Sequence, residues 1–206
     1  MTSYAPQDRI SEGATGPRRN VDARASLNAR RLRAAPETFV TDRLVATRIA
    51  DDDLEDFLSF YVDPAVMRLL SPAGEPYAPD AATELFHGHV AHWDQHGFGT
   101  WIFRDTEGRF IGRAGLRSMD LETGPEVELF YGVASDRWGR GYATEIAGGI
   151  ISLAFEVLGV GSLVAFALPT NKASLRVLAK CGFVEAGELM HAGLRHGLFR
   201  LAPQPH

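Results

Sequence analysis

Apolar residues along this chain recur with two spacings, one typical of strands and one typical of helices. Short apolar runs separated by turn sequences predict strands; they lie at residues 39–49, 100–104, 110–119, 127–133 and 162–168, with two closing strands in residues 183–201. Apolar residues three or four positions apart predict helices at residues 54–61, 80–93, 142–158 and 172–180. This order of elements predicts an α+β domain in which a mixed central sheet is flanked by helices.

Polar residues, prolines and glycines mark the ends of several elements. Three aspartates at residues 51–53 supply an N-cap and an acidic first turn, and Asp63 with Pro64 ends the helix that follows. The longest apolar region, residues 146–168, is interrupted by Glu156 and by the glycines at 159 and 161. We therefore expect it to divide into a buried helix and a strand, and we expect no membrane span.

The segment after the strand at residues 127–133 has the composition of a phosphate-binding loop. It reads Trp138-Gly139-Arg140-Gly141-Tyr142-Ala143 and continues into a helix. Two glycines separated by one residue allow a tight turn with exposed N–H groups, and the helix adds the positive end of its dipole. The loop lacks the Gly-Lys-Ser/Thr ending of nucleotide triphosphatases, and no second βαβ unit supports dinucleotide binding.

Other segments occur in a fixed order around this loop. They are Thr41-Asp42-Arg43-Leu44, Gly108-Arg109-Phe110-Ile111-Gly112, Glu128-Leu129-Phe130-Tyr131, Asn171-Lys172-Ala173-Ser174 and Lys180-Cys181-Gly182-Phe183-Val184. Together with the loop they resemble the GNAT superfamily of acyl-CoA-dependent N-acyltransferases, in particular its RimJ/RimL-like branch. The resemblance covers residues 41 to about 201. Trp138 stands where the broad superfamily has Gln or Arg, but Trp is common there in this branch.

The resemblance implies the GNAT fold, acetyl-CoA as cosubstrate, no metal, and direct sequential transfer of the acetyl group to a primary amine. It implies cofactor contacts from Val133, Arg137, Trp138, Gly139, Arg140, Gly141, Tyr142, Ala143, Thr144 and Asn171. The arginines and Thr144 would meet phosphates, Asn171 the pantetheine arm, and the backbone near Val133 the thioester carbonyl. The acceptor is a small-molecule amine or a protein N-terminus.

Glu128 and Ser174 are the candidate catalytic residues. Glu128 would accept the proton of the attacking amine through a water; the alternative is an ion pair with Arg113 or Arg117 on the neighbouring strand. Leu178 occupies the position of the superfamily's usual Tyr acid, so Ser174 is the substitute that would donate a hydrogen bond to the leaving thiolate. The alternative for Ser174 is an N-terminal helix cap.

The histidines of residues 80–96 are a second candidate site. His89, His92 and His96 share one face of the predicted helix, at a spacing suited to metal binding, and His87 lies nearby. No cysteine or carboxylate cluster completes a metal site there. We therefore expect these histidines to line an acceptor pocket or to lie at the surface.

Composition and charge narrow the function further. The chain has 206 residues, a net charge of −5 and a 45% hydrophobic share, which favour a globular protein and disfavour a general nucleic-acid binder. Cys181 is the single cysteine, so no intramolecular disulfide forms, and residues 1–20 lack the apolar core of a signal peptide. We expect a cytoplasmic location, and association as a homodimer stays open.

The organisation of the chain is expected to be simple. Residues 1–37 predict a flexible, arginine-rich arm, residues 38–202 the GNAT domain, and residues 203–206 a tail. A helix at residues 23–34, or docking of the arm on a partner or ribosomal RNA, are alternatives. The alternative function is a non-catalytic acyl-CoA-binding sensor or assembly module.

Overall fold

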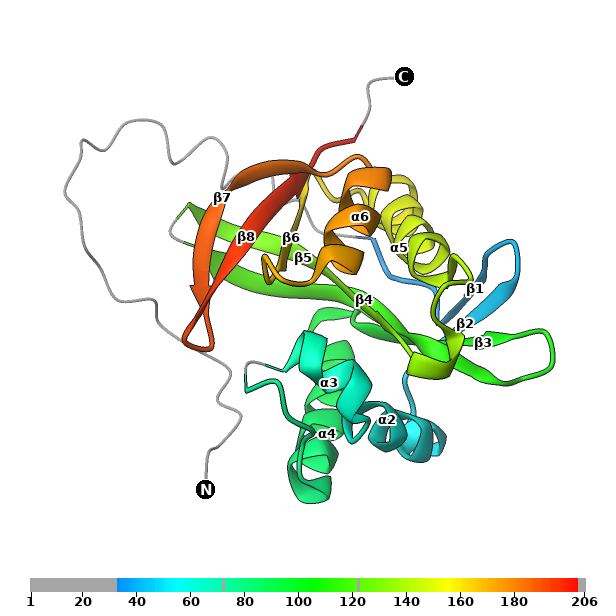
Figure 1. Cartoon of the computed structure of the whole chain (residues 1–206). Helices are drawn as coiled ribbons and strands as arrows, with labels where there is room; N and C mark the ends of the chain where they lie inside the picture. The colour runs from blue at the N-terminus through cyan, green and yellow to red at the C-terminus, as the bar shows by residue number, and fades with distance from the viewer. Residues whose placement is uncertain (1–32, 72, 122, 204–206) are drawn as a thin grey trace.

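The computed structural model describes residues 33–71, 73–121 and 123–203, and shows one eight-stranded sheet with helices on both faces (Figure 1). The strands are β1 (Thr38–Val40), β2 (Leu44–Arg48), β3 (Thr100–Asp105), β4 (Phe110–Leu121), β5 (Gly124–Val133), β6 (Leu163–Ala167), β7 (Val184–His191) and β8 (Leu194–Leu201). The helices are η1 (Asp51–Asp53), α2 (Leu54–Tyr61), α3 (Pro64–Leu70), α4 (Pro79–His96), η2 (Ser135–Arg137), α5 (Tyr142–Ser152), η3 (Leu153–Leu158) and α6 (Lys172–Lys180). This architecture confirms the predicted α+β class, with a mixed sheet flanked by helices.

The sheet order is β1-β2-β3-β4-β5-β6-β8-β7, and every neighbouring pair is antiparallel except β5 and β6. The parallel pair shares a single register position, Glu128 opposite Val164. Beyond Glu128 the two strands diverge, so the second half of β5 has no strand partner on that side among the described residues. The sheet is therefore split beside the end of β5, where the glycine loop begins.

Strand alternation assigns the side chains of β5 to the two faces of the sheet. Phe130 faces α4, with its ring 5.7 Å from that of His89, whereas the hydroxyl of Tyr131 reaches Ser174 on α6. Because alternate residues share a face, Glu126 and Glu128 lie on the side of α2 and α4. These helices and the α5–α6 pair cover opposite sides of the sheet in Figure 1.

The core lies between the sheet and each helical layer. Trp101, Phe103 and Leu116 of the sheet are fully buried, as are Phe57 of α2 and Ile146 of α5. Each such side chain contributes about 1.5–3 kcal/mol through removal of apolar surface from water. The aromatic residues near residue 100 also belong to the core, since Trp93 and Phe98 are 4% exposed and Trp101 is 0% exposed.

Two elements differ from the sequence prediction. Residues 39–49 form a hairpin of two short strands rather than one strand, because the N–H of Thr41 donates to the carbonyl of Leu44 across a tight turn. The predicted helix at residues 142–158 is continuous, but its last six residues, Leu153–Leu158, are a π-helix that ends at the left-handed Gly159. The hairpin matters for the site because its turn lies against α5.

The residues before β1 contact the domain where the structure describes them. The N–H of Arg33 donates to Leu158, and the indole of Trp101 donates to the carbonyl of Pro36 at 3.1 Å. The predicted arm falls mainly on residues 1–32, which lie outside the described residues, as do residues 204–206 of the predicted tail. Within the described part of the chain, no helix has the length and apolar character needed to cross a membrane.

Candidate functional site

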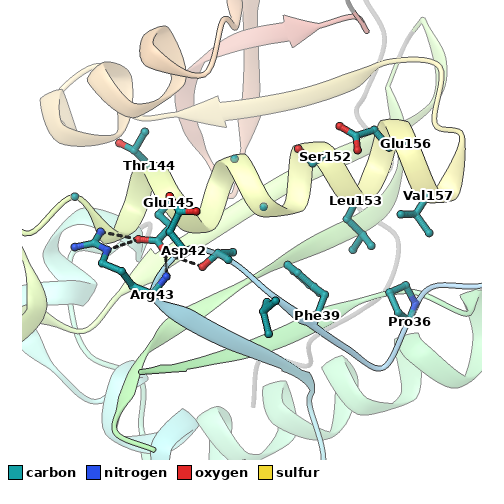
Figure 2. A pocket seen from close by; sticks show the side chains of 15 residues that line it. Pro36, Phe39, Asp42, Arg43, Thr144, Glu145, Ser152, Leu153, Glu156 and Val157 are labelled. Carbon is teal, nitrogen blue, oxygen red and sulfur yellow. Dashed lines mark hydrogen bonds and ion pairs between the residues drawn. The ribbon is translucent and has the colours of Figure 1, made fainter. Parts of the chain in front are cut away.

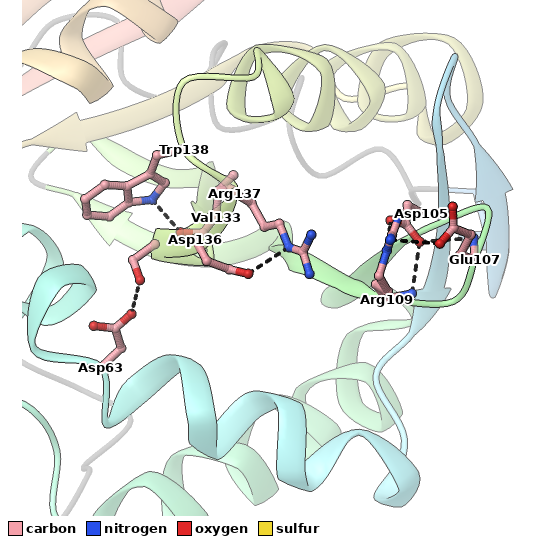
Figure 3. A network of polar contacts seen from close by, with 9 residues as sticks. Asp63, Asp105, Glu107, Arg109, Val133, Asp136, Arg137 and Trp138 are labelled. Atoms are coloured by element: carbon pink, nitrogen blue, oxygen red, sulfur yellow. Dashed lines mark hydrogen bonds and ion pairs between the residues drawn. The ribbon is translucent and has the colours of Figure 1, made fainter.

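The glycine loop connects η2 to α5 beside the split in the sheet. Gly139 and Gly141 have φ angles of 75° and 82°, in the left-handed region that side chains with a Cβ adopt only at a cost. The indole N–H of Trp138 donates to the carbonyl of Val133 at 2.8 Å (Figure 3), which ties the loop to the end of β5. The predicted tight turn is therefore present, and Trp138 closes it.

The N–H groups of this loop are available to a ligand. The N–H groups of Thr144 and Glu145 donate to the carbonyl of Gly141, but no described residue accepts from those of residues 139–143. Converging N–H groups at the N-terminus of an eleven-residue helix suit a diphosphate. The loop thus fits the diphosphate of acetyl-CoA, and residues 139–143 are the groups that would hold it.

An ion-pair network fixes the loop from the β1–β2 turn (Figure 2). The carboxylate of Glu145 accepts from the hydroxyl of Thr41 at 2.6 Å and from the backbone and guanidinium of Arg43 at 2.8 and 2.7 Å. Arg43 also donates to the carbonyl of Arg140 at 3.0 Å and lies 4.5 Å above the ring of Tyr142. Burial opposes ionisation of Glu145, but the hydrogen bonds from Thr41 and Arg43 outweigh it and lower its pKa.

The role of Arg43 was not visible in the sequence. Its segment was recognised only as the opening strand, because a contact between residues 43 and 145 is set by the tertiary fold. A turn predicted at residues 41–43 would have placed Arg43 at the end of a hairpin. The prediction of one continuous strand at residues 39–49 left this turn out.

The two arginines that flank the loop are placed differently. Arg137 lies on η2 and points toward the β3–β4 hairpin (Figure 3), with its Nε 3.1 Å from a carboxylate oxygen of Asp136. The angle does not give a hydrogen bond, and Nε is buried without a hydrogen-bond partner. Arg140 is exposed and has no ion-pair partner among the described residues. Arg140 is therefore freer than Arg137 to meet a phosphate.

The first turn of α5 carries the remaining predicted phosphate contacts. Tyr142, Ala143 and Thr144 are half-buried, and the hydroxyl of Thr144 makes no hydrogen bond within the described residues. In Figure 2 the Thr144 side chain projects from the opposite side of α5 to the Arg43 network. It is thus available to a ligand that approaches that side of the helix.

Glu128 is buried at the point where β5 and β6 diverge. Its side chain is 5% exposed, and its Oε2 accepts from Nη2 and Nε of Arg117 at 2.6 and 2.8 Å. The alternative of an ion pair with Arg117 is therefore confirmed. Both hydrogen bonds use Oε2, however, and Oε1 has no hydrogen-bond partner among the described residues. Glu128 thus keeps one oxygen with which it can accept a proton through water.

Ser174 lies across the split from β5 and is bonded to a second hydroxyl. Its Oγ is 2.9 Å from the hydroxyl of Tyr131. The capping alternative is taken by Asn171 instead, whose side-chain oxygen accepts from the N–H of Ser174 at 3.0 Å and whose amide donates to Leu69 at 3.3 Å. Leu178 is 1% exposed and packs in the core, so it supplies no acid.

Tyr131 is the residue that sequence analysis missed at this position. It was noted only as part of a motif, and its alternation in β5 gave no sign that α6 would meet it. Burial raises the pKa of Tyr131 to about 12. Its hydroxyl therefore stays protonated at neutral pH and acts as a hydrogen-bond donor.

The histidines of α4 do not converge. His89 Nδ1 is 2.7 Å from the hydroxyl of Thr100, whereas His92 stacks on His96 with ring centroids 4.3 Å apart. Burial lowers the pKa of His92 to about 4, with smaller effects from the charges of His96 and Arg117. In the part of the chain that the structure describes, no group of three or more possible ligands could hold a metal.

Known proteins resemble this chain in sequence and in structure. Residues 43–184 match the family model described as an acetyltransferase (GNAT) domain. The protein YkkB of Bacillus subtilis (strain 168) is 34% identical over 150 residues, which cover 72% of this chain and 86% of that protein. The FsC-acetyl coenzyme A-N(2)-transacetylase of Aspergillus fumigatus is 30% identical over 159 residues, 73% of this chain and 66% of that protein.

A solved structure agrees with these sequence matches. The crystal structure of an acetyltransferase from Agrobacterium tumefaciens str. C58 superposes with a TM-score of 0.70 at 25% identity and covers 82% of this chain and 96% of that one. The family model matches well over half of the chain. The chain belongs to the GNAT acetyltransferase family and is an acetyl-CoA-dependent N-acetyltransferase.

Proposed function

We propose that the chain transfers an acetyl group directly from acetyl-CoA to a primary amine, with both substrates bound at the split between β5 and β6. The observation that carries this proposal is the set of N–H groups of residues 139–143, which have no acceptor in the described chain and lie beside the split. Bound acetyl-CoA supplies an activated thioester. The protein binds the diphosphate, orients the amine, accepts the proton of the amine and donates a hydrogen bond to the departing sulfur.

Glu128 acts on the amine. A primary amine is mostly protonated at neutral pH and attacks only as the free base. Oε1 of Glu128 accepts the proton through a water, while Arg117 holds the other oxygen and fixes the direction of the carboxylate. The amine nitrogen then forms its bond to the carbonyl carbon as the carbon–sulfur bond breaks.

Ser174 and Tyr131 act on the departing sulfur. A hydroxyl is much less acidic than a thiol, so neither residue gives up its proton fully; the pair instead donates a hydrogen bond that stabilises the thiolate. Either hydroxyl can donate in this pair, and the Tyr131 hydroxyl also lies 3.2 Å from the backbone carbonyl of Ser174. When Tyr131 donates to the Ser174 hydroxyl, the Ser174 proton is directed outward to the sulfur. Solvent then protonates the thiolate.

The finer assignment is a RimJ/RimL-like enzyme of the cytoplasm that acts on a small amine or a protein N-terminus. The Asn171-Lys172-Ala173-Ser174 segment and Trp138 in the glycine loop support the branch. The single cysteine supports a compartment in which disulfides are not needed.

The test is acceptor-dependent thiol release. Acetyl-CoA and a panel of amines are incubated with the protein, and free thiol and acetylated product are measured together. The proposal predicts that both form in equal amounts and only when an acceptor is present. Binding of CoA without turnover for any amine would instead describe the acyl-CoA-binding module and would contradict the proposal.

A further inference from the structure

Arg113 of β4 lies on the acceptor face of the sheet, close to where the chemistry takes place. It is directly opposite Gly132 on β5, one residue before Val133. The ring of Phe60 occupies the space above Gly132, since a Cβ there would lie 2.5 Å from it. Arg113 is thus placed beside the end of β5, on the side of α2 and α4.

Aromatic rings hold the Arg113 guanidinium. Its central carbon lies 5.5 Å from the ring centroid of Phe60, 5.3 Å from that of Tyr61 and 4.9 Å from that of Phe130. Cation–π contacts of this kind orient a guanidinium but leave its N–H groups without acceptors. The Nε of Arg113 is buried and has no hydrogen-bond partner.

Two neighbouring arginines of this face are paired with carboxylates. Arg117 pairs with Glu128, and Arg200 of β8 pairs with Glu126 at 2.7 Å. No described carboxylate lies within ion-pair distance of Arg113. Arg113 is therefore the arginine of this group whose charge no described side chain neutralises.

Neighbouring groups do not supply the missing anion. Asp63, from the same helical layer, accepts from the N–H of Ala65 at 2.8 Å and from the hydroxyl of Ser135 at 2.5 Å. Burial, followed by the charges of Arg113 and Arg117, lowers the pKa of His89 well below its usual value, so His89 is neutral. A guanidinium left partly buried without an anion is unfavourable, and a ligand anion would relieve it.

We propose that the acceptor is an amine with a carboxylate close to it, as in an α-amino acid, and that Arg113 binds this carboxylate. The inference rests on the proposed function, because it assigns one end of the acceptor to Arg113 and the amine end to Glu128. A guanidinium matches a carboxylate in a planar, two-bond arrangement that a lysine does not reproduce.

The spacing on the face suits such a molecule. Gly132 and Glu128 are four residues apart on β5, about 13 Å at the rise of a strand. Phe130 lies between them, and the guanidinium of Arg113 reaches over its ring. Arg113 and Glu128 therefore flank Phe130 on one face of the sheet, so a short molecule that carries both an amine and a carboxylate suits them. A polyamine would instead place a second cation against Arg113.

The first experiment compares acceptors that differ only in the carboxylate. Thiol release is measured with saturating acetyl-CoA for free L-amino acids, for the same amino acids as C-terminal amides, for spermidine and for a peptide with a free N-terminus and an amidated C-terminus. We expect kcat/KM for the best free acid to exceed that of its amide by roughly 10- to 100-fold, the worth of a charge-assisted hydrogen bond. Amides, spermidine or the peptide serving equally well or better would refute the inference while leaving the proposed function standing. No turnover with any amine would overturn both.

The second experiment separates binding from a structural role. In Arg113→Met the preference for acid over amide falls to about one, mainly through KM, and Arg113→Lys recovers only part of it. The affinity for CoA, measured by calorimetry, stays at its wild-type value. Arg109→Met removes an exposed arginine of the β3–β4 turn and serves as the control. Equal losses with acid and amide in Arg113→Met would show that Arg113 only supports the fold.

Discussion

The two sides of the site are built in different ways. The loop of residues 139–143 presents backbone N–H groups, and its shape depends on two left-handed glycines and on the Arg43–Glu145 network. The acceptor face presents side chains, with Glu128 on β5 and Arg113 on β4 facing the same side of the sheet. A ligand that all members of a family share can be held by the main chain, whereas a variable acceptor must be recognised by side chains. Binding of CoA and choice of acceptor should therefore be separable by mutation.

The largest expected effect is on turnover without loss of CoA binding. Glu128→Gln removes the proton acceptor but keeps a side chain that can accept from Arg117, so we expect kcat to fall by roughly 10²- to 10⁴-fold. Glu126→Gln is the matched control, because Glu126 is a buried carboxylate two residues earlier, paired with Arg200. Steady-state kinetics with calorimetry of CoA binding checks the prediction. Equal activity of the two variants would remove Glu128 from the mechanism.

A variant of the glycine loop should lose affinity for CoA while the acceptor face stays intact. Gly141→Val puts a β-branched residue at a φ of 82°, which costs on the order of 1–3 kcal/mol and displaces the loop N–H groups. We expect affinity for CoA to fall by roughly 100-fold. Gly148→Ala in α5 has open space around it and should bind CoA normally. Normal binding by Gly141→Val would mean that the backbone of this loop is not the phosphate site.

The hydroxyl pair across the split should act as one unit. Ser174→Ala and Tyr131→Phe are each expected to lower kcat by roughly 10- to 100-fold, somewhat less than loss of a full oxyanion donor. The double variant should be little worse than either single variant, because both remove the same hydrogen bond to the sulfur. Steady-state kinetics of the wild-type protein, the two single variants and the double variant gives a double-mutant cycle. Fully additive losses would assign the two hydroxyls separate tasks.

A smaller effect is expected where a side chain supports the backbone loop. Arg43→Met removes the contacts to Glu145 and Arg140, but Arg43 is about half exposed, so solvent screening limits the loss. We expect KM for acetyl-CoA to rise by roughly 5-fold with kcat nearly unchanged. Arg195→Met, which breaks an exposed pair with Glu188 on the β7–β8 hairpin, should change neither parameter. An unchanged KM in Arg43→Met would show that the loop holds its shape alone.

The smallest effect concerns the pH dependence of stability on the acceptor side. His89 and His92 have pKa values below the unfolded value, so the unfolded chain binds protons that the folded chain does not. Stability is complete above pH 6.5 and falls as the pH drops from there toward about 4. Each histidine adds up to about 1.4 kcal/mol per pH unit to the slope. Urea unfolding at several pH values, for the wild-type protein and for His92→Gln, measures this slope. An equal slope in the two proteins would contradict the prediction for His92.

The features that could be predicted from the sequence also differ between the backbone loop and the side-chain contacts of the site. The loop, the fold and the strand faces were predictable because glycine spacing and residue periodicity are local signals. The ion pair of Glu128 was foreseen as an alternative because Arg117 is its cross-strand neighbour. Arg43 with Glu145, and Tyr131 with Ser174, were not foreseen, because each contact joins residues far apart in the chain and depends on how α5 and α6 pack on the sheet.

The most direct test of the loop's role is calorimetry with CoA and with pantetheine, which lacks the phosphates. If the N–H groups of residues 139–143 hold the diphosphate, CoA binds the wild-type protein at least roughly 100-fold more tightly than pantetheine, and Gly141→Val removes most of this difference. Equal affinity of the wild-type protein for the two molecules would contradict the assignment.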